Sequence, residues 1–398
     1  MLRISYSLSG GVVHLNQKLR NSLLLLATVS LLLSGCSKPA GNGEPVIKIG
    51  SASPLTGPQA HLGKDNANGA QLAVDEINAS GLILGGKKMH LELIAEDDQA
   101  DPKTATTVAQ KLVDDDVAGV IGHLNSGATI PASKIYYDAE IPQISPSATA
   151  VSYTAQGFNT AFRVMSNDRQ QGEALGRFTV NQLGAKRIAI IDDRSAYGQG
   201  LADEFEKAVK VAGGTVVARE YTTDKATDFM AILTSIKAHA PQVVFFGGMD
   251  PQAAPLARQM HELGLHAQLL GGDGMQTPLF IKLAGRDAEG AIASTPGLPV
   301  LEMPGGRAFK QKFNARYGEI QNYSPYAYDA VYVLIEAMKR AQSADPAKYL
   351  AELPKTDYQG VTGHIRFDRK GDLANSAITL YRVESGVWRP LKTMQSAK

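Results

Sequence analysis

Short apolar runs alternate with longer amphipathic segments from residue 46 onward, and this order constrains the fold of the 398-residue chain more than any other feature. VIKIGSA and MHLELIAED are typical of strands, whereas GAQLAVDEINAS, closed by Gly81, and PKTATTVAQKLVDD, opened by Pro102, are typical of helices. VAGVIG then predicts a buried strand. Strands that alternate with helices imply a parallel sheet covered by helices on both faces.

A second series of the same kind begins at KRIAIIDD and runs to AQLLGGDG, so we expect two Rossmann-like α/β lobes with parallel central sheets. The chain is expected to cross between them near RVMSNDRQQG and IASTPGLP. More helix follows, and IRFDRKGDLANSAITLYRV predicts a closing hairpin. The expected N-terminal lobe comprises residues 46–166 and 297–372, and the C-terminal lobe comprises 167–296 and 373–398.

The first thirty-five residues are typical of a secretory signal peptide. Three basic and no acidic side chains accompany an apolar core of 11 residues, Leu23 to Leu33, which is too short for a bilayer that takes about 20 residues. The core ends in Leu-Ser-Gly-Cys, which resembles the bacterial lipoprotein box, and Cys36 is the single cysteine. We therefore expect export, lipidation of Cys36 and a flexible tether at residues 36–45.

Two neighbouring loops carry small hydroxyl residues where strands are expected to end. Asn125 and Ser126 follow VAGVIG, and ISPSATA places Ser147 and Thr149 after the next apolar run. Ligands of open parallel sheets bind at the carboxyl ends of the strands. The start of a helix at SGAT offers unpaired amides that favour an anion, although Ser and Thr also cap their own helices routinely. Tyr197 and Asp273 hold the corresponding position in the second series.

A carboxylate held by amides and hydroxyls, together with an ammonium paired with Asp273, describes a zwitterionic amino acid. Enzyme, cofactor and metal readings find less support in the sequence. GPQAHLGKD departs from a phosphate-binding loop because Asp65 stands where Ser or Thr is needed, and the histidines of HELGLH are five residues apart instead of four. His123 is expected to be a packed, hydrogen-bonded histidine. A net charge of +1 gives no reason to expect nucleic acid as a partner.

From about Val46 to the C-terminal region, the sequence resembles the leucine/isoleucine/valine-binding proteins, the extracytoplasmic receptors of branched-chain amino acid ABC transporters. The resemblance rests on PLTGPQAHLGKDNANGAQLAVDEIN, VIGHLNSGATIPASKIY, ISPSATA, AYGQG and SPYAYDAVYVL. It implies a type I periplasmic binding fold, in which two lobes joined by crossover strands close over one ligand. It further implies a monomer without catalytic activity or cofactor, which presents its closed form to a permease.

The resemblance also implies a set of binding residues. Ser126, Ser147 and Thr149 would contact the carboxylate and ammonium, Tyr197 and Asp273 would close from the other lobe, and Tyr323 would lie near the ligand side chain. The remaining positions implied to line the pocket are Leu62, Leu124, Asn125, Ala148 and Met249. Leu62 and Met249 stand where leucine-type receptors carry tyrosines, and Ala100 and Asn125 replace a cysteine pair that some members bridge.

These departures favour an apolar wall for aliphatic amino acids, broader than leucine, isoleucine and valine alone. Two alternatives remain open at the level of sequence. The same fold could bind a short amide, urea or another small carboxylate, or the protein could act as a ligand sensor instead of a transport receptor.

Overall fold

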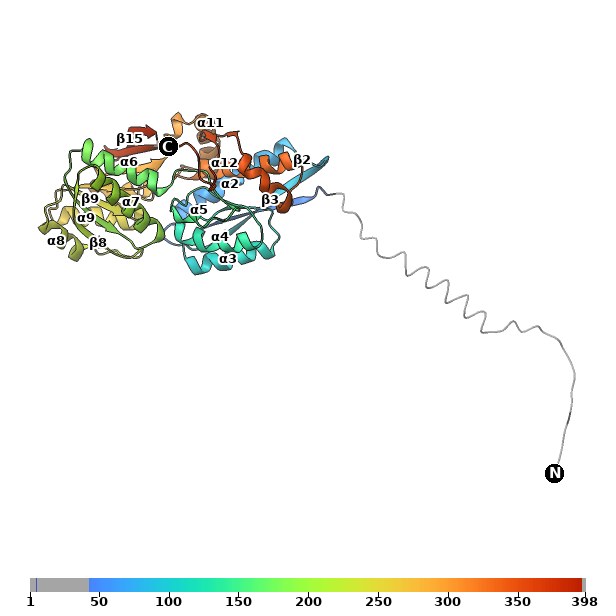
Figure 1. The fold of residues 1–398 in the computed structure, drawn as a ribbon, viewed down its shortest axis with the longest axis horizontal. Coiled ribbons are helices and arrows are strands. Elements are labelled where there is room, and N and C mark those ends of the chain that lie inside the picture. The colour runs from blue at the N-terminus through green and yellow to red at the C-terminus, as the bar shows by residue number, and fades with distance from the viewer. Residues whose placement is uncertain (1–4, 6–42, 396–398) are drawn as a thin grey trace, which may run out of the picture. The chain divides into compact units, whose positions relative to one another are not determined.

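Two central β-sheets organise the chain from Pro45 onward, and helices cover both faces of each sheet (Figure 1). The computed structural model describes Ser5 and residues 43–395. The signal peptide, Cys36 and most of the tether expected from the sequence lie outside the described residues. We call the part built on the first sheet the N-terminal lobe and the part built on the second sheet the C-terminal lobe.

The N-terminal lobe has a six-stranded sheet in the order β2-β3-β1-β4-β5-β6. The strands β1, β3, β4, β5 and β6 are parallel, as expected, whereas β2 pairs antiparallel with β3 at the edge. The strands are β1 (Val46–Ser53), β2 (Leu82–Leu84), β3 (Lys87–Asp97), β4 (Val120–Gly122), β5 (Gln143–Ser145) and β6 (Ala161–Arg163).

Helices α2 and α12 cover one face of this sheet, and α3 and α4 cover the other. Alternate side chains of a strand point to opposite faces, so Ile121 packs in the cluster of α2 and α12 while its neighbour Val120 packs with Leu112 and Tyr136 of α3 and α4. The helical segments are α2 (Ala60–Ser80), α3 (Pro102–Asp114), α4 (Ser126–Asp138), α5 (Ser152–Ala155), η2 (Val300–Glu302), α11 (Gly306–Tyr317), α12 (Ser324–Ala341), α13 (Pro346–Tyr349) and η3 (Leu350–Lys355).

The C-terminal lobe has a seven-stranded sheet in the order β15-β14-β11-β10-β9-β7-β8. Five strands are parallel, and β14 and β15 extend the sheet as an antiparallel pair. The strands are β7 (Arg187–Asp192), β8 (Thr215–Tyr221), β9 (Val243–Gly247), β10 (Gln268–Gly271), β11 (Ile292–Pro296), β14 (Ala377–Glu384) and β15 (Val387–Gln395).

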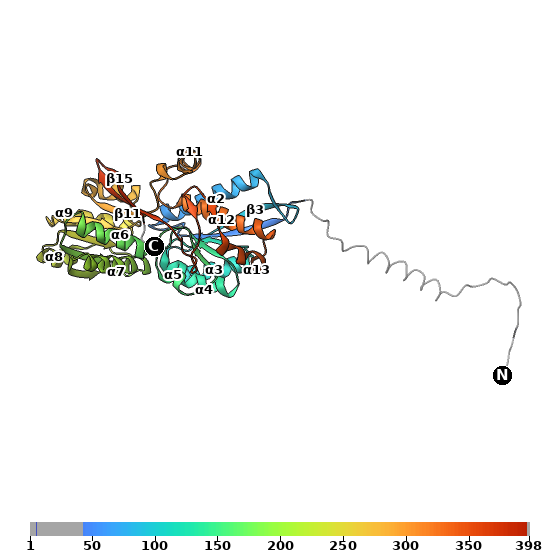
Figure 2. The ribbon, with the colours of Figure 1, turned by 45° about the horizontal axis from the view of Figure 1, so that its top comes forward.

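Helices α6 and α7 pack on one face of the second sheet, and α8, α9 and α10 pack on the other. Figure 2 shows α6, α7, α8 and α9 of this lobe from a second angle. Ile188 and Ile190 of β7 face the first pair, whereas Ala189 and Ile191 face the second group. The helical segments are α6 (Asp168–Asn181), α7 (Ala196–Val211), α8 (Met230–Ala238), α9 (Asp250–Glu262), α10 (Pro278–Ala284) and η1 (Gly285–Ala288).

The closing hairpin lies further along the chain than the sequence pattern predicts. The expected segment 365–383 contains only one long strand, β14, because Ile365 belongs to a short pair of strands, β12 (Tyr358–Gln359) with β13 (His364–Ile365). The hairpin instead joins β14 to β15 through Ser385 and Gly386, whose φ angles are 54° and 72°. Two consecutive residues with positive φ suit the tight turn that twisted strands favour, and glycine adopts this conformation without strain.

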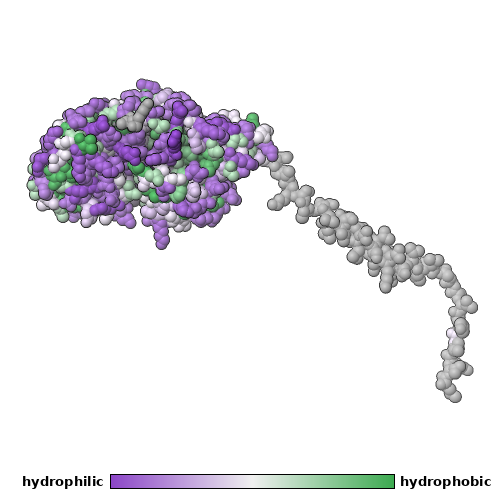
Figure 3. All heavy atoms as spheres, viewed as in Figure 1, coloured by the Kyte–Doolittle hydropathy of each residue, from purple (hydrophilic) through white to green (hydrophobic). Residues whose placement is uncertain are grey.

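The surface seen in Figure 3 is mostly hydrophilic, with apolar side chains scattered over it. Large exposed hydrophobic residues are found on both lobes, among them Ile83, Val211 and Leu301. No helix within residues 43–395 combines the length and the apolar character needed to cross a membrane.

Candidate functional site

The loops at the carboxyl ends of β4 and β5 meet those that follow β7, β9 and β10 of the other lobe. Between them lies a small cavity. Eight of the residues expected from the sequence line it: Leu124, Asn125, Ser126, Ser147, Tyr197, Met249, Asp273 and Tyr323. Segments from Leu124 to Tyr323, far apart in the sequence, therefore converge where open α/β sheets place their ligands.

The carboxylate of Asp273 is the polar centre of this cavity. Oδ1 accepts hydrogen bonds from the Tyr197 hydroxyl at 2.9 Å and from Gln171 Nε2 at 3.0 Å. Oδ2 accepts a bond of 2.8 Å from the Tyr323 hydroxyl. Burial raises the pKa of Asp273 above its usual value, and the hydrogen bonds from Gln171, Tyr323 and Tyr197 oppose that rise. A cation beside this carboxylate would stabilise its charged form.

Tyr323 is placed by a buried carboxylate on the opposite helix of its own lobe. Asp65 of α2 accepts hydrogen bonds from four successive backbone amides, those of residues 321–324, at 2.7–3.1 Å. These amides lie at the start of α12, where a negative charge complements the helix dipole. Asn322 Nδ2 also donates to the Asp273 backbone oxygen at 3.0 Å. The same turn therefore fixes Tyr323 and contacts the other lobe.

The Ser126 and Ser147 hydroxyls of the N-terminal lobe bind neighbouring segments and do not cap their own helices. Ser126 Oγ accepts a bond of 3.1 Å from the backbone amide of Ala150, which links the loop after β4 to the loop after β5. Ser147 Oγ accepts a bond of 3.0 Å from Asn66 Nδ2 on α2. Helix α4 begins at Ser126 with Asn125 as its N-terminal cap residue. The amides of its first turn thus border the cavity, as a carboxylate-binding site requires.

Arg163, at the end of β6, holds the loop of residues 147–150 from behind. Its Nη1 donates to the backbone oxygens of Ala148 at 2.8 Å and Ala150 at 2.9 Å, and its Nη2 pairs with Asp372 at 2.5 Å. Ala148 and Thr149 are buried in this loop, one and two residues beyond the cavity-lining Ser147. Their side chains do not belong to the cavity lining among the described residues.

Leu62 is a further expected site residue that does not line the cavity, and it lies in the hydrophobic core. It is fully buried in the core cluster that surrounds α2 and does not line the cavity formed by the described residues. Leu62 lies in the first turn of α2, and its side chain points into the hydrophobic core. His61, one residue earlier, instead reaches the other lobe, where its Nε2 lies 2.8 Å from Asp250 Oδ2.

His123 is buried between two partners, as expected from the sequence. Its Nδ1 lies 2.7 Å from Asp98 Oδ2 and its Nε2 lies 3.1 Å from the Tyr136 hydroxyl. The backbone oxygen of His123 accepts bonds from Thr129 and Ser145. This histidine therefore ties together the loops after β3, β4 and β5, close to the positions of Ala100 and Asn125, and both of its ring nitrogens are occupied.

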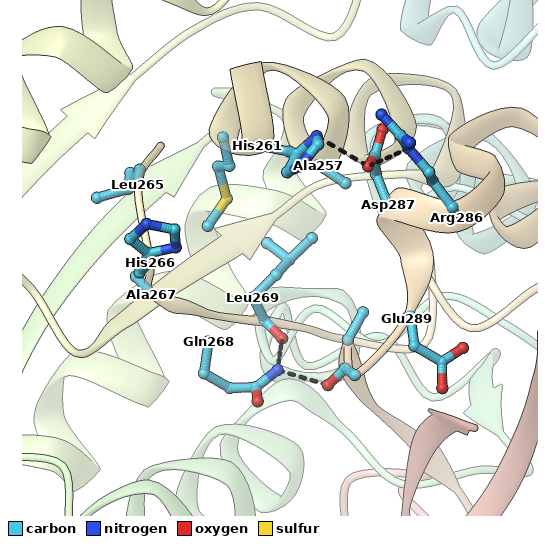
Figure 4. A pocket seen from close by; sticks show the side chains of 13 residues that line it. Ala257, His261, Leu265, His266, Ala267, Gln268, Leu269, Arg286, Asp287 and Glu289 are labelled. Atoms are coloured by element: carbon cyan, nitrogen blue, oxygen red, sulfur yellow. Dashed lines mark hydrogen bonds and ion pairs between the residues drawn. The ribbon is translucent and has the colours of Figure 1, made fainter. Parts of the chain in front are cut away.

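A larger surface pocket, of about 550 Å³, lies at the opposite end of the C-terminal lobe, where β10 and β11 begin (Figure 4). Polar side chains that line it already have partners: His261 pairs with Asp287 at 3.2 Å, and Gln268 Nε2 donates to the backbone oxygens of Leu269 and Gly290. In the part of the chain that the structure describes, no group of three or more His, Cys, Asp or Glu side chains is arranged to hold a metal ion.

The chain is similar to known proteins over most of its length. The family model described as periplasmic binding protein matches residues 46–387. The chain belongs to this family. It is 36% identical to the Leu/Ile/Val-binding protein BraC3 of Rhizobium johnstonii, covering 90% of this chain and 97% of that protein, and 39% identical to an amino acid binding protein of Pseudomonas aeruginosa, covering 84% and 89%.

Solved structures of periplasmic binding proteins have the same architecture. The leucine binding protein LivK of Thermotoga maritima matches with a TM-score of 0.81 at 27% identity, covering 87% of this chain and 98% of that chain. The branched-chain amino acid transporter substrate-binding protein LivJ of Streptococcus pneumoniae, in complex with isoleucine, matches with a TM-score of 0.80 at 29% identity, covering 88% and 99%. The expected type I periplasmic binding fold and the resemblance to Leu/Ile/Val-binding proteins are confirmed.

Several residues that shape the site were missed by sequence reasoning. Gln171, Asn322 and Asp250 are polar residues inside or beside helices, where a polar letter usually indicates a solvent-exposed face. In the sequence, Asp65 served only as evidence against a phosphate-binding loop, and its role at the start of α12 was not predicted. A signal did exist in GKDNANG, because two buried polar residues, Asp65 and Asn66, stand side by side with small residues in a helix that packs against the core.

Proposed function

We propose that this protein is an extracytoplasmic receptor that captures an aliphatic amino acid and delivers it to an ABC transporter permease. The observation that carries the proposal is the position of the buried Asp273 carboxylate opposite the hydroxyl loops and the start of α4. A negative site and an anion-binding site on the two walls of one cleft complement the two charges of an α-amino acid.

In this proposal the α-carboxylate accepts hydrogen bonds from the first amides of α4 and from the Ser126 hydroxyl. The ammonium donates to Asp273 and to oxygens of the loop at residues 147–149. Each hydrogen bond to a charged group contributes about 1.5–3 kcal/mol. The hydroxyls of Tyr197 and Tyr323, which donate to Asp273, would then also form hydrogen bonds with the ligand.

The side-chain end of the cavity supports an aliphatic ligand. Leu124 and Met249 provide apolar surface, and both are at most 5% exposed. Methionine adapts its shape readily because its side chain is unbranched, so this wall accommodates leucine, isoleucine, valine and related aliphatic side chains. The names of the relatives, which include a Leu-, Ile-, Val-, Thr- and Ala-binding protein of Pseudomonas aeruginosa, support the same class of ligand.

Binding would proceed by closure of the lobes and involve no catalytic step or cofactor. In the closed form Tyr323 and Asn322 contact Asp273, and His61 contacts Asp250, so both rims of the cleft are joined. A ligand favours closure only by its greater affinity for the closed form. We further propose that the receptor is a monomer, exported by its signal peptide and anchored to a bacterial membrane through lipid on Cys36.

A thermal-shift screen tests the ligand class. The chain from Ser37 onward is unfolded and refolded to remove ligand carried through purification, and then heated with each of the twenty amino acids, with urea and with short amides. A ligand present at one hundred times its Kd adds about 2.7 kcal/mol to the free energy of unfolding. We expect the largest shifts with leucine, isoleucine and valine. Shifts only with a charged amino acid, or only with amides, would refute the proposal.

A further inference from the structure

Asp168 is a buried carboxylate without an evident local role. It is the first residue of α6 and its side chain is 0% exposed. Neither of its carboxylate oxygens has a hydrogen-bond partner of good geometry among the described residues, although the Thr149 hydroxyl lies near enough to lower the pKa of Asp168. Buried polar atoms are nearly always paired, so each exception calls for an explanation.

Capping of α6 does not explain this residue. Asn167 caps the helix through a reciprocal pair of bonds with Gln170, and the Asp168 backbone amide donates to the Thr149 backbone oxygen at 2.8 Å. Asp168 thereby lies against the loop that ends in Thr149, whose hydroxyl is also buried without a partner of good geometry in the described chain. The side chain of Asp168 also packs on α7, where its Oδ2 would lie 3.4 Å from a Cβ at Gly200.

Asp168 belongs to the same helix face as the residue that binds Asp273. Gln171 follows one turn later on α6 and donates its amide to Asp273 Oδ1 at 3.0 Å. Residues three apart on a helix are neighbours on its surface. Asp168 and Asp273 are therefore two buried carboxylates close enough to interact, and Asp273 is the one that lines the cavity.

The charged groups around Asp168 are predominantly negative. Burial raises the pKa of Asp168 well above its usual range; the Thr149 hydroxyl and Arg163 lower it, whereas Asp273 and Glu204 raise it further. The positive charge of Arg163 is already paired with Asp372. Burial, and then the charges of Asp273 and Asp168, raise the pKa of Tyr197 well above its usual value, so its hydroxyl stays protonated. The closed cleft thus concentrates negative charge that its own cations do not balance.

We propose that Asp168 is a specificity-determining residue, whose buried charge makes closure of the cleft conditional on a cationic amine in the ligand. This inference rests on the proposed function. With an ammonium in the cavity, Asp168 and Asp273 can both remain charged when the lobes close. With a ligand that carries only a carboxylate, closure must bury two uncompensated negative charges or bind a proton, and both outcomes weaken binding.

The test compares two ligands that differ in one group. L-leucine and its 2-oxo analogue, 4-methyl-2-oxopentanoate, share the carboxylate and the isobutyl chain, but only leucine has an ammonium. The ratio of their Kd values is measured by calorimetry at pH 7.5 for the wild type, for Asp168→Asn and for Asp329→Asn. Asp329 is another buried carboxylate, which lies on α12 and binds the backbone amides of Val361 and Thr362.

We expect Asp168→Asn to reduce the preference for leucine by about tenfold or more, the effect of one pKa unit of charge interaction, and Asp329→Asn to leave the ratio unchanged. An unchanged ratio in Asp168→Asn would refute the inference while leaving the amino-acid receptor intact. If the wild type bound no amino acid, the proposed function and this inference would fall together.

If Asp168→Asn does not fold, the pH dependence of both Kd values in the wild type tests the role of Asp168 instead. Closure around the 2-oxo acid should bind a proton, so its affinity should rise between pH 7.5 and pH 5, whereas that of leucine should change less. In Asp273→Asn the affinity for the 2-oxo acid should still rise as the pH falls, because closure still buries the negative charge of Asp168 without a cation beside it. Loss of the slope in Asp273→Asn, or equal slopes for both ligands in the wild type, would contradict the role of Asp168.

Discussion

The hydroxyl of Tyr323 donates a hydrogen bond of 2.8 Å to Oδ2 of Asp273, and this bond joins the two lobes across the binding cavity. Tyr323 comes from the start of α12 on the N-terminal lobe, and Asp273 follows β10 on the C-terminal lobe. Both side chains are almost fully buried, so the bond forms only when the lobes are together. Ligand affinity and closure are therefore coupled through this pair.

Removal of the Tyr323 hydroxyl should weaken ligand binding by destabilising the closed form. A hydrogen bond to a charged group contributes about 1.5–3 kcal/mol, so Tyr323→Phe should reduce leucine affinity by about 10- to 100-fold, measured by calorimetry. Tyr349→Phe is the matched control, because the buried Tyr349 hydroxyl donates to the Ala118 backbone oxygen within the N-terminal lobe. It should reduce thermal stability with little effect on affinity. Equal affinities for wild type and Tyr323→Phe would contradict this account of closure.

The apolar wall should determine which amino acids fit. Met249→Ala enlarges the cavity beside Leu124, so we expect leucine to bind more weakly, by about 1–3 kcal/mol for the lost apolar contacts, and phenylalanine to gain relative to leucine. Met260→Ala serves as the control, because this buried methionine lies at the opposite end of α9. Competition binding with both amino acids measures the change. An unaltered order of preference in Met249→Ala would show that another surface selects the side chain.

Asp329 should make the protein less stable as the pH rises from 4 to 6. Burial raises its pKa to about 6, although hydrogen bonds from Thr362 and Val361 oppose the rise. A carboxyl with a raised pKa in the folded state binds more protons there than in the unfolded chain, so its stabilising contribution is present below about pH 4 and is lost as the pH approaches 6. The shift corresponds to about 3 kcal/mol.

Urea unfolding at several pH values measures this contribution. In Asp329→Asn the decline of the unfolding free energy between pH 4 and pH 6 should be smaller than in the wild type. Asp97→Asn is the contrasting control: slight burial raises the pKa of Asp97, but hydrogen bonds from Thr56, Gln99 and Leu55 lower it on balance. Its contribution is lost only below pH 4, so the slope from 4 to 6 should remain. If the unfolding free energy of Asp329→Asn declined between pH 4 and pH 6 as much as that of the wild type, groups other than Asp329 would cause the decline.

Cys36→Ser should release the exported protein from the membrane. Lipidation needs the thiol, and serine has nearly the same size but cannot form the thioether. Cell fractionation of a bacterium that expresses the full chain should find the wild type in the membrane fraction and Cys36→Ser outside it. Labelling with a fatty-acid analogue should mark only the wild type. A membrane-bound, unlabelled wild type would mean that residues 1–35 anchor the protein without lipid.

The alternation of apolar runs was sufficient to predict the two lobes, because each strand and helix is specified by local periodicity. Site residues could be predicted where they directly follow a strand, as with Ser126, Ser147 and Asp273, since the carboxyl edge of the sheet collects them. The hairpin was misplaced because the polar, glycine-containing segment 366–376 looks like a turn between two strands, whereas Phe367 and Leu373 within it form only an isolated bridge.

Contacts made across long sequence distances could not be predicted in the same way. Asp65 and the amides of residues 321–324 are more than 250 residues apart, and their meeting depends on how α2 and α12 pack. His61 and Asp250 meet only through closure of the lobes. Leu62 was expected in the cavity because it stands where leucine-type receptors carry a tyrosine, but its helix directs the side chain into the core. Successive residues of a helix differ by about 100° in direction, so His61 can reach the other lobe while Leu62 points into the core.

The most direct test of the amino-acid site is a calorimetric titration of L-leucine into the refolded wild type and into Asp273→Ala. The wild type should bind one leucine per chain, and the variant should lose about 2–5 kcal/mol of binding free energy, because its ammonium partner is missing from a buried site. No binding to the wild type, or a loss in Asp273→Ala of less than about a tenth of that range, would contradict the role assigned to this carboxylate.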